Sequence, residues 1–150
     1  MRSHFLLLVF LCFSGWLRSQ VINATDTIQH DSILKVEMHL SAFGVESDDF
    51  PSIDVVIDFV ADTNRCYMSY YNPAHKDSVY RLTKEQMHDV ASLLDHSDLD
   101  QLKPEYSIDR TDQPSSTTII TTNRMKYHIE DYGLVGEYPL RQLYRIVYRF

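Results

Sequence analysis

Cysteine and glycine are scarce in this chain of 150 residues, which contains two cysteines and four glycines. The glycines form neither G-x-G-x-x-G nor G-x-x-x-x-G-K. Loops that hold phosphates need several glycines, because the backbone must approach the anion closely, so nucleotide-binding loops of these kinds are excluded. The pattern G-x-S-x-G is also missing, which argues against the nucleophile turn of an α/β-hydrolase.

Basic residues are outnumbered, since 14 lysines and arginines face 21 aspartates and glutamates and the formal net charge is −7. A nucleic-acid binder neutralises phosphates with a basic surface, so we expect no nucleic-acid partner. Hydrophobic residues make up 44% of the chain, which is ordinary for a globular domain and argues against disorder.

The first nineteen residues predict a secretory signal peptide. A short cationic start is followed by an apolar run from Phe5 to Leu17, and Ser19 offers a small residue for cleavage. The run is too short for a transmembrane helix, which needs about 20 residues. We therefore expect residues 1–19 to be removed, the protein to be exported to the periplasm or secreted, and the mature chain to lack a transmembrane segment.

Cleavage near Ser19 changes the composition. It leaves 131 residues with 12 basic and 21 acidic side chains, a net charge of −9, because Arg2 and Arg18 are lost. Cys66 becomes the only cysteine, so no intrachain disulfide and no cysteine-based zinc site can form. A chain of this length can bury enough surface to fold on an apolar core alone. We expect no cofactor and no metal.

Alternating apolar and polar residues predict two groups of strands. In the first group, a strand covers residues 34–40, and a hairpin joins residues 53–60 to Cys66–Tyr71. A short extended piece near residues 79–82 adds an edge. The second group is a hairpin of residues 117–122 and 126–132. Residues 20–32 show no sustained period and form a polar leader.

Helical spacing appears twice. Thr83 and Gln86 form a capping-box pattern before a helix of about residues 84–95, whose apolar side chains recur every three or four residues. A second helix follows Pro139, a residue favoured at the first helical position. The order is strands, helix, strands, helix. It predicts one α+β domain over residues 33–150, an antiparallel sheet of about five strands with two helices on one face.

The order of these features resembles a family of small exported bacterial domains of unknown function, DUF6438. The similar positions are Phe43-Gly44, Pro51, Leu82-Thr83-Lys84-Glu85, Leu99, Leu102, Tyr106, Asp112-Gln113-Pro114, Asp131-Tyr132 and Pro139-Leu140. The resemblance implies the α+β fold and export, and it implies no activity. The family's first turn is similar to Cys-Tyr-Gly-x-Cys-Pro, whereas this chain has a longer segment from Ala42 to Pro51 without cysteine. No thiol or disulfide role can therefore be carried over.

The polar faces of the strands hold the candidate chemistry. Two histidines and three carboxylates could converge there for acid–base or metal chemistry: His39, His128, Asp54, Asp58 and Glu130. The competing interpretation, which we favour, is a solvated sheet face with cross-strand charge pairs. An acidic stretch at residues 95–100 could similarly suggest calcium, but it lacks the glycine and the distal glutamate of an EF-hand loop.

Tyrosine and arginine supply candidate binding residues. The chain has ten tyrosines, and alternation places Tyr67 and Tyr71 on the same face of their strand, where exposed rings would suit a protein or glycan partner. Arg141 and Arg145 lie opposite the apolar stripe of the last helix. We expect a non-catalytic exported domain that binds a protein or an envelope component as a monomer or weak oligomer. A small hydrolase or metal-dependent enzyme is the alternative.

Overall fold

The computed structural model describes residues 31–149. The predicted signal peptide, residues 1–19, and all but the last two residues of the predicted polar leader lie outside the described residues. In the part that the structure describes, no helix is long and apolar enough to cross a membrane.

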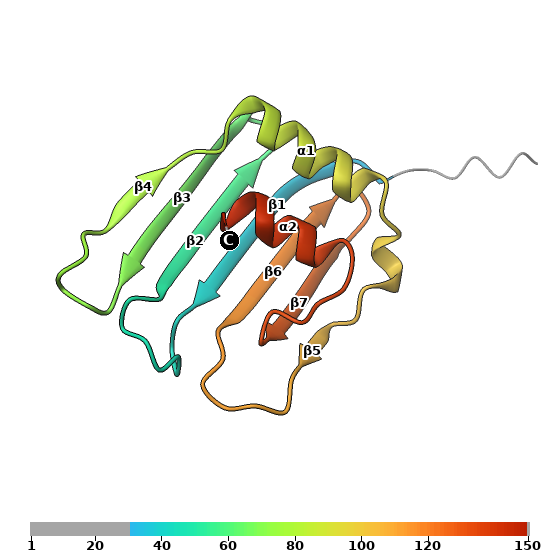
Figure 1. The fold of residues 1–150 in the computed structure, drawn as a ribbon. Helices are drawn as coiled ribbons and strands as arrows, with labels where there is room; N and C mark the ends of the chain where they lie inside the picture. The colour runs from blue at the N-terminus through green and yellow to red at the C-terminus, as the bar shows by residue number, and fades with distance from the viewer. Residues whose placement is uncertain (1–30, 150) are drawn as a thin grey trace, which may run out of the picture.

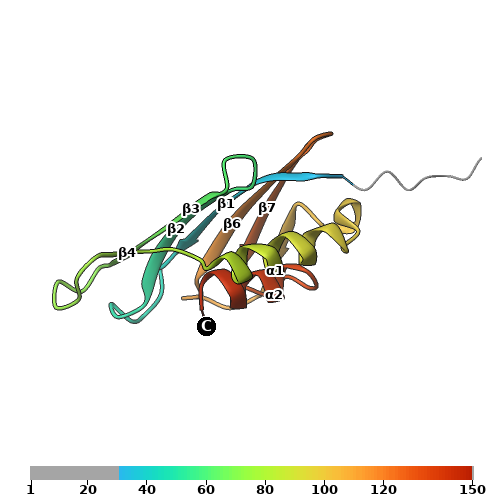
Figure 2. The ribbon, with the colours of Figure 1, turned by 90° about the horizontal axis from the view of Figure 1, so that it is seen from above.

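Seven strands form one sheet in the order β4-β3-β2-β1-β6-β7-β5 (Figure 1). In chain order they are β1 (Ile33–Ser41), β2 (Pro51–Asp58), β3 (Thr63–Tyr70), β4 (Ser78–Tyr80), β5 (Glu105–Ser107), β6 (Ser115–Thr122) and β7 (Lys126–Tyr132). The helices are α1 (Lys84–Asp95) and α2 (Leu140–Val147), with a short 3₁₀ turn at Leu99–Gln101 between α1 and β5. Both helices lie on the same side of the sheet, and no element of residues 31–149 covers the other side, which we call the open face (Figure 2).

The core is formed by apolar side chains at every second residue of the strands. On β1, Val36, Met38 and Leu40 are buried beneath the helices, and β2 contributes the side chains of Ile53, Val55 and Ile57 to the same layer. The helices close this layer with a stripe of buried residues on each: Met87, Val90 and Leu94 on α1, and Leu140, Leu143, Tyr144 and Val147 on α2. Burial of apolar surface at roughly 25 cal/mol per Å² is the main term that holds the two layers together.

The start of α1 follows the predicted capping box. The Thr83 hydroxyl accepts from the Gln86 backbone N–H, and the Gln86 side chain accepts in return from the Thr83 N–H. The expected helix of residues 84–95 is therefore confirmed at both ends. The α+β class, with two helices on one face, is confirmed as well.

The strand count and the sheet direction differ from the prediction. The sheet has seven strands instead of about five, and it is mixed, because β5 pairs with β7 in parallel. Of the two additional strands, β4 overlaps the short edge piece expected near residues 79–82, whereas β5 was not expected. Each has three residues, too few to establish an alternating pattern. The parallel pairing follows from the chain path, since the segment after α1 returns along the outer side of β7 (Figure 1).

A buried polar cluster lies under α2. The Asp131 side chain, about 1% exposed, accepts hydrogen bonds from the backbone N–H groups of Val135 and Gly136 and from the Tyr144 hydroxyl. These three contacts fix the loop between β7 and α2. Beside them, the Ser116 and Tyr148 hydroxyls lie 2.7 Å apart. Burial is the main cause that raises the pKa values of Tyr144 and Tyr148 well above the usual range of a tyrosine.

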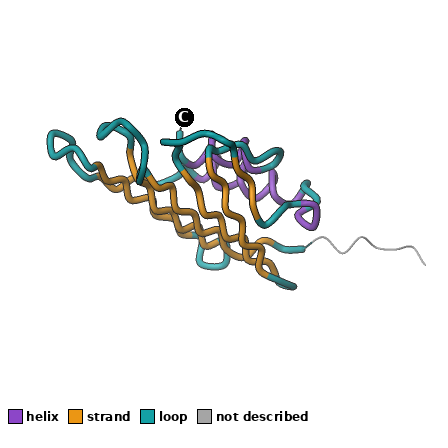
Figure 3. The backbone as a smooth tube through the Cα atoms, turned by 90° about the horizontal axis from the view of Figure 1, so that it is seen from below, coloured by secondary structure: helices purple, strands orange, loops and turns teal. Residues whose placement is uncertain are grey.

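Two loops project past the same end of the sheet, loop 42–50 between β1 and β2 and loop 71–77 between β3 and β4 (Figure 3). They lie side by side because β2 and β3 form a hairpin in full register from Pro51–Tyr70 to Asp58–Thr63. The Asn72 N–H donates to the Asp48 carbonyl and joins the two loops directly. This end of the molecule positions the candidate site.

Candidate functional site

A cavity of about 550 Å³ opens beside loop 42–50 and reaches Tyr71, the first residue of loop 71–77, and we call it the loop cleft. Its lining consists of Ser41, Ala42, Phe43, Gly44, Val45, Ser47, Asp48, Phe50, Ser52, Ser69, Tyr70 and Tyr71. Residues far apart in the sequence meet there, from the end of β1, loop 42–50, the start of β2 and the end of β3. Its volume falls within the size range of ligand pockets.

Four aromatic rings line the loop cleft. Phe43 is 93% exposed and Tyr71 is 84% exposed, whereas Phe50 and Tyr70 are partly buried and support the cleft from below. Gly44 follows Phe43 with φ +85°, a conformation that glycine adopts without strain, and this allows the loop to turn here. Two large, exposed aromatic rings therefore belong to the lining of one cavity.

Asp49 holds the two walls together. Its carboxylate accepts from the Asn72 side-chain amide at 2.7 Å and lies 3.0 Å from His75 Nε2, and the His75 ring packs on Tyr70 with centroids 4.7 Å apart. The Asn72 and His75 contacts lower the pKa of Asp49. Because the folded pKa is depressed, the link is complete above the ordinary pKa of an aspartate and weakens as the pH falls through the lowered value.

Asp48 is the only charged side chain among the lining residues of the loop cleft. Within residues 31–149, no hydrogen bond or ion pair is recorded for its carboxylate, in contrast to the carboxylate of Asp49 next to it. Three serine hydroxyls of the cleft lining form hydrogen bonds with the backbone of loop 42–50. Ser41, Ser47 and Ser52 each accept a hydrogen bond from a backbone N–H of loop 42–50.

The predicted histidine–carboxylate candidates lie on the open face of the sheet. His39 Nδ1 lies 2.6 Å from Asp54, and His128 Nε2 lies 2.8 Å from Glu130, which also accepts from the Thr117 hydroxyl. Strand register separates the two pairs. His39 is opposite Thr117, Thr117 is opposite Glu130, and His128 is two residues farther along β7. Strand spacing of about 4.8 Å and a rise of about 3.4 Å per residue put the histidine Cα atoms roughly 12 Å apart.

The open face thus brings candidates together in two separate pairs. The hollow around His39 and Asp54 has a volume of about 230 Å³, and His128 does not line it. Asp58 accepts from the backbone N–H groups of Val60 and Ala61 in the turn after β2, away from both histidines in the register. Within residues 31–149, no group of three or more histidine, cysteine or acidic side chains is placed to hold a metal ion.

The predicted binding residues lie in three places. Tyr71 follows the end of β3 and lines the loop cleft, while Tyr67 lies on the open face and donates its hydroxyl hydrogen to Asp77, which raises its pKa. Tyr67 is not among the residues that line the loop cleft, so the two tyrosines do not share this cavity. Arg141 and Arg145 are exposed on α2 and line a shallow hollow of about 320 Å³ together with Glu137, Tyr138 and Gln142.

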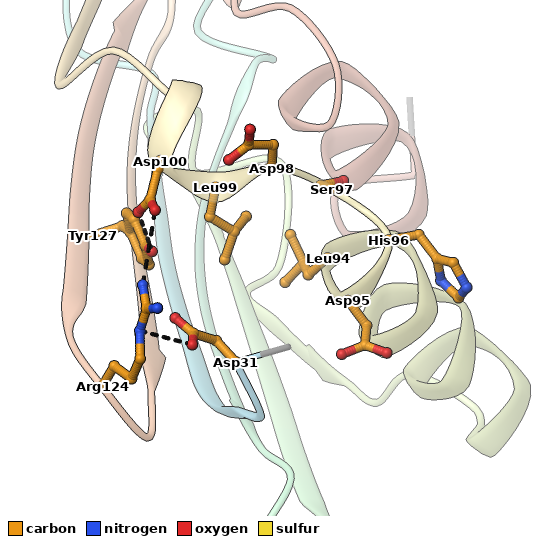
Figure 4. Close-up of a pocket in the computed structure, with 10 residues that line it drawn as sticks. All are labelled: Asp31, Leu94, Asp95, His96, Ser97, Asp98, Leu99, Asp100, Arg124 and Tyr127. Carbon is orange, nitrogen blue, oxygen red and sulfur yellow. Dashed lines mark hydrogen bonds and ion pairs between the residues drawn. The ribbon is translucent and has the colours of Figure 1, made fainter. Parts of the chain in front are cut away.

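An acidic hollow of about 390 Å³ lies at the opposite end of the sheet from the loop cleft (Figure 4). It includes Asp31 and the residues that follow α1. Arg124 lies 2.8 Å from Asp31 and 3.7 Å from Asp100, and Asp100 also accepts from the Tyr127 hydroxyl. Partial burial and the Asp100 contact raise the pKa of Tyr127 to about 12. These contacts tie the start of β1 to the β6–β7 turn and to the segment after α1.

Sequence reasoning missed the loop cleft because its walls are not periodic and lie some thirty residues apart. One signal was present. Aromatic residues occur in the turn-forming segments before and after the β2–β3 hairpin. Phe43 and Phe50 lie in the first segment, and Tyr70 and Tyr71 lie where the second begins. Large apolar side chains beside turn residues are unusual, because loops face water.

The comparison with protein families agrees with the earlier resemblance. The model of the family described as Domain of unknown function (DUF6438) matches residues 51–150, two-thirds of the chain. The chain belongs to the DUF6438 family. The part matched to DUF6438 begins at Pro51, so loop 42–50, which forms one wall of the loop cleft, precedes it. No curated protein and no solved structure matches the chain.

Proposed function

We propose that this protein is an exported, non-catalytic binding module that captures a segment of a protein partner or envelope component in the loop cleft. The observation that carries the proposal is the pair of aromatic rings at the cleft, Phe43 at 93% and Tyr71 at 84% exposure. A buried aromatic ring contributes 150–250 Å² of contact area at an interface and loses little conformational freedom, which is why such rings dominate binding energies.

The loops beside the cleft support this function because hydrogen bonds hold them in place before a partner binds. Asp49 joins loop 71–77 through Asn72 and His75, and the Asn72 backbone joins loop 42–50 at the Asp48 carbonyl. A partner that binds between loops already tied together loses less entropy than one that must order them. Export rests on the N-terminal pattern of the sequence, a short cationic start, an apolar run and the cleavage position near Ser19.

Peptide selection tests the proposal. A random heptapeptide library displayed on phage is selected on the immobilised full-length protein, and the dissociation constants of the retained peptides are measured. We expect Phe43→Ala and Tyr71→Ala each to weaken binding about tenfold or more, as for central aromatic side chains of interfaces. Tyr138→Ala is the matched control, because Tyr138 is an exposed aromatic residue, 54% accessible, beside α2. Equal affinity for the wild type and both cleft variants would refute the proposal.

A small hydrolase or metal-dependent enzyme on the open face is the second candidate, and one contact favours it. Asp54 holds the imidazole of His39 at 2.6 Å, as a carboxylate does when it orients a general base. The hollow there is shallow, with side chains about half exposed, so water would screen its charges. His39→Gln separates the candidates, since it removes this pair and leaves the loop cleft intact.

A further inference from the structure

We infer that the loop cleft recognises an arginine side chain of its polypeptide partner, with the guanidinium group between the aromatic rings and the Asp48 carboxylate. The inference rests on the proposed binding function and names the chemistry of the occupant. Three observations carry it: the exposed rings of Phe43 and Tyr71, the absence of a recorded partner for the Asp48 carboxylate within residues 31–149, and the absence of lysine and arginine from the lining.

The charge of the cleft selects the sign of the ligand. Glu46 and Asp49 lie on the same loop as Asp48, whereas Lys76 and Asp77 balance each other on loop 71–77. The two loops together are therefore acidic, and an acidic segment would be repelled. A purely apolar segment would also fit poorly, because it would remove water from the Asp48 carboxylate and give no opposite charge in return. A cationic side chain would be attracted by the acidic loop and would give the Asp48 carboxylate an opposite charge.

Among cations, the aromatic walls favour arginine. A guanidinium group is planar and weakly hydrated, so it stacks on aromatic rings and still donates hydrogen bonds to a carboxylate, whereas an ammonium group keeps its water more strongly. The fold already contains this packing. The Arg149 guanidinium lies 4.3 Å from the centre of the Tyr80 ring while it donates to the Arg81 carbonyl. Among the described residues that line the loop cleft, the rings and the acceptor are present and lysine and arginine are not.

The test uses the peptides retained in the phage selection, each synthesised with its arginines and again with glutamine in their place. We expect arginine to be enriched in the selected sequences, and we expect the glutamine versions to bind about tenfold more weakly to the wild-type protein. Asp48→Asn should remove most of that difference. Glu46→Gln is the matched control, because it neutralises a carboxylate of the same loop that does not line the cleft.

The outcomes separate the inference from the proposed function. Peptides that depend on Phe43 and Tyr71 but bind equally well with arginine or glutamine would overturn the arginine inference and leave the binding module standing. A loss of arginine preference in Glu46→Gln equal to that in Asp48→Asn would overturn the role of Asp48, since it would show a general charge effect. Retained peptides indifferent to Phe43 and Tyr71 would overturn both.

Discussion

On the covered face of the sheet, Asp131 is about 1% exposed and accepts three hydrogen bonds. On the open face, the Asp54 side chain is 62% exposed and its recorded contact is His39 at 2.6 Å, with His39 itself 51% exposed. Both carboxylates have partners at hydrogen-bonding distance. Their energetic weight differs, because water competes for Asp54 and solvates the group whenever the pair opens, and it cannot reach Asp131.

The contrast shows that short distances alone do not rank the polar contacts of this protein. A network that excludes water is expensive to break, because each member then remains buried without a partner. A pair on the open sheet face is exchanged for water at little cost. Two predictions separate the two faces and a third ranks a contact within the covered face, from the largest expected effect to the smallest.

Thiol reactivity should differ most between the faces. Cys66 faces the core from β3 with no exposed surface, and burial raises the pKa of its thiol. In a Cys12→Ser background, we expect its reaction with an aromatic disulfide reagent at pH 8 to be about a thousandfold slower than for the unfolded chain, because the reagent must wait for the core to open.

The matched control places a thiol on the other face. Val56 lies on β2 and is 42% exposed on the open face, so Val56→Cys in a Cys12→Ser, Cys66→Ala background should react close to the unfolded rate. Both rates are followed by absorbance of the released thiolate. Similar protection of the two thiols would show that water does not distinguish the faces as described.

Removal of the Asp131 carboxylate should lower the free energy of unfolding by about 3 kcal/mol. Asp131→Ala leaves the N–H groups of Val135 and Gly136 and the Tyr144 hydroxyl without their acceptor in a buried site. The equivalent change on the open face, Asp54→Ala, should lower it by about 0.5 kcal/mol or less. Urea unfolding followed by circular dichroism measures both values, and equal losses would contradict the comparison.

The Ser116–Tyr148 contact should give the smallest effect within the covered face. Tyr148→Phe should destabilise the protein by about 1 kcal/mol, because it leaves the buried Ser116 hydroxyl without this hydrogen bond. The double variant Tyr148→Phe, Ser116→Ala should be no less stable than Tyr148→Phe alone, since both polar groups are then gone. Additive losses in a urea double-mutant cycle would show that the two hydroxyls act independently.

The predictable parts of the fold are those with a long enough period. β1 and α1 each repeat their pattern over several side chains, and the capping box of α1 is a local signal. β4 and β5 are held by their neighbours in the sheet, and three residues carry no pattern of their own. The parallel direction of β5 depends on where the chain returns after α1, which no short window of sequence contains.

The candidate site was harder to predict for a related reason. Tyr71 was identified as an exposed ring, but its neighbours Phe43 and Asp48 come from another loop, which reaches it only because β2 and β3 pair in register. The buried role of Asp131 had a visible signal, since it shares a strand face with Ile129 two residues earlier. A charged residue on an apolar face indicates a paired or hydrogen-bonded group, and its partners, the Gly136 N–H and Tyr144, come from the chain that follows.

The position of α2 in the chain order has a consequence for synthesis. Five buried core side chains lie between residues 140 and 148, and the Tyr80 hydroxyl of the edge strand β4 donates to the Val147 carbonyl. The apolar layer of the sheet therefore cannot be closed until the ribosome has added residue 148. At a synthesis rate of about 5–20 residues per second, the apolar face of β1 remains without the cover of α2 for several seconds. Until α2 has been added, the buried side chains of β1 and β2 lack one of the two helices that cover them.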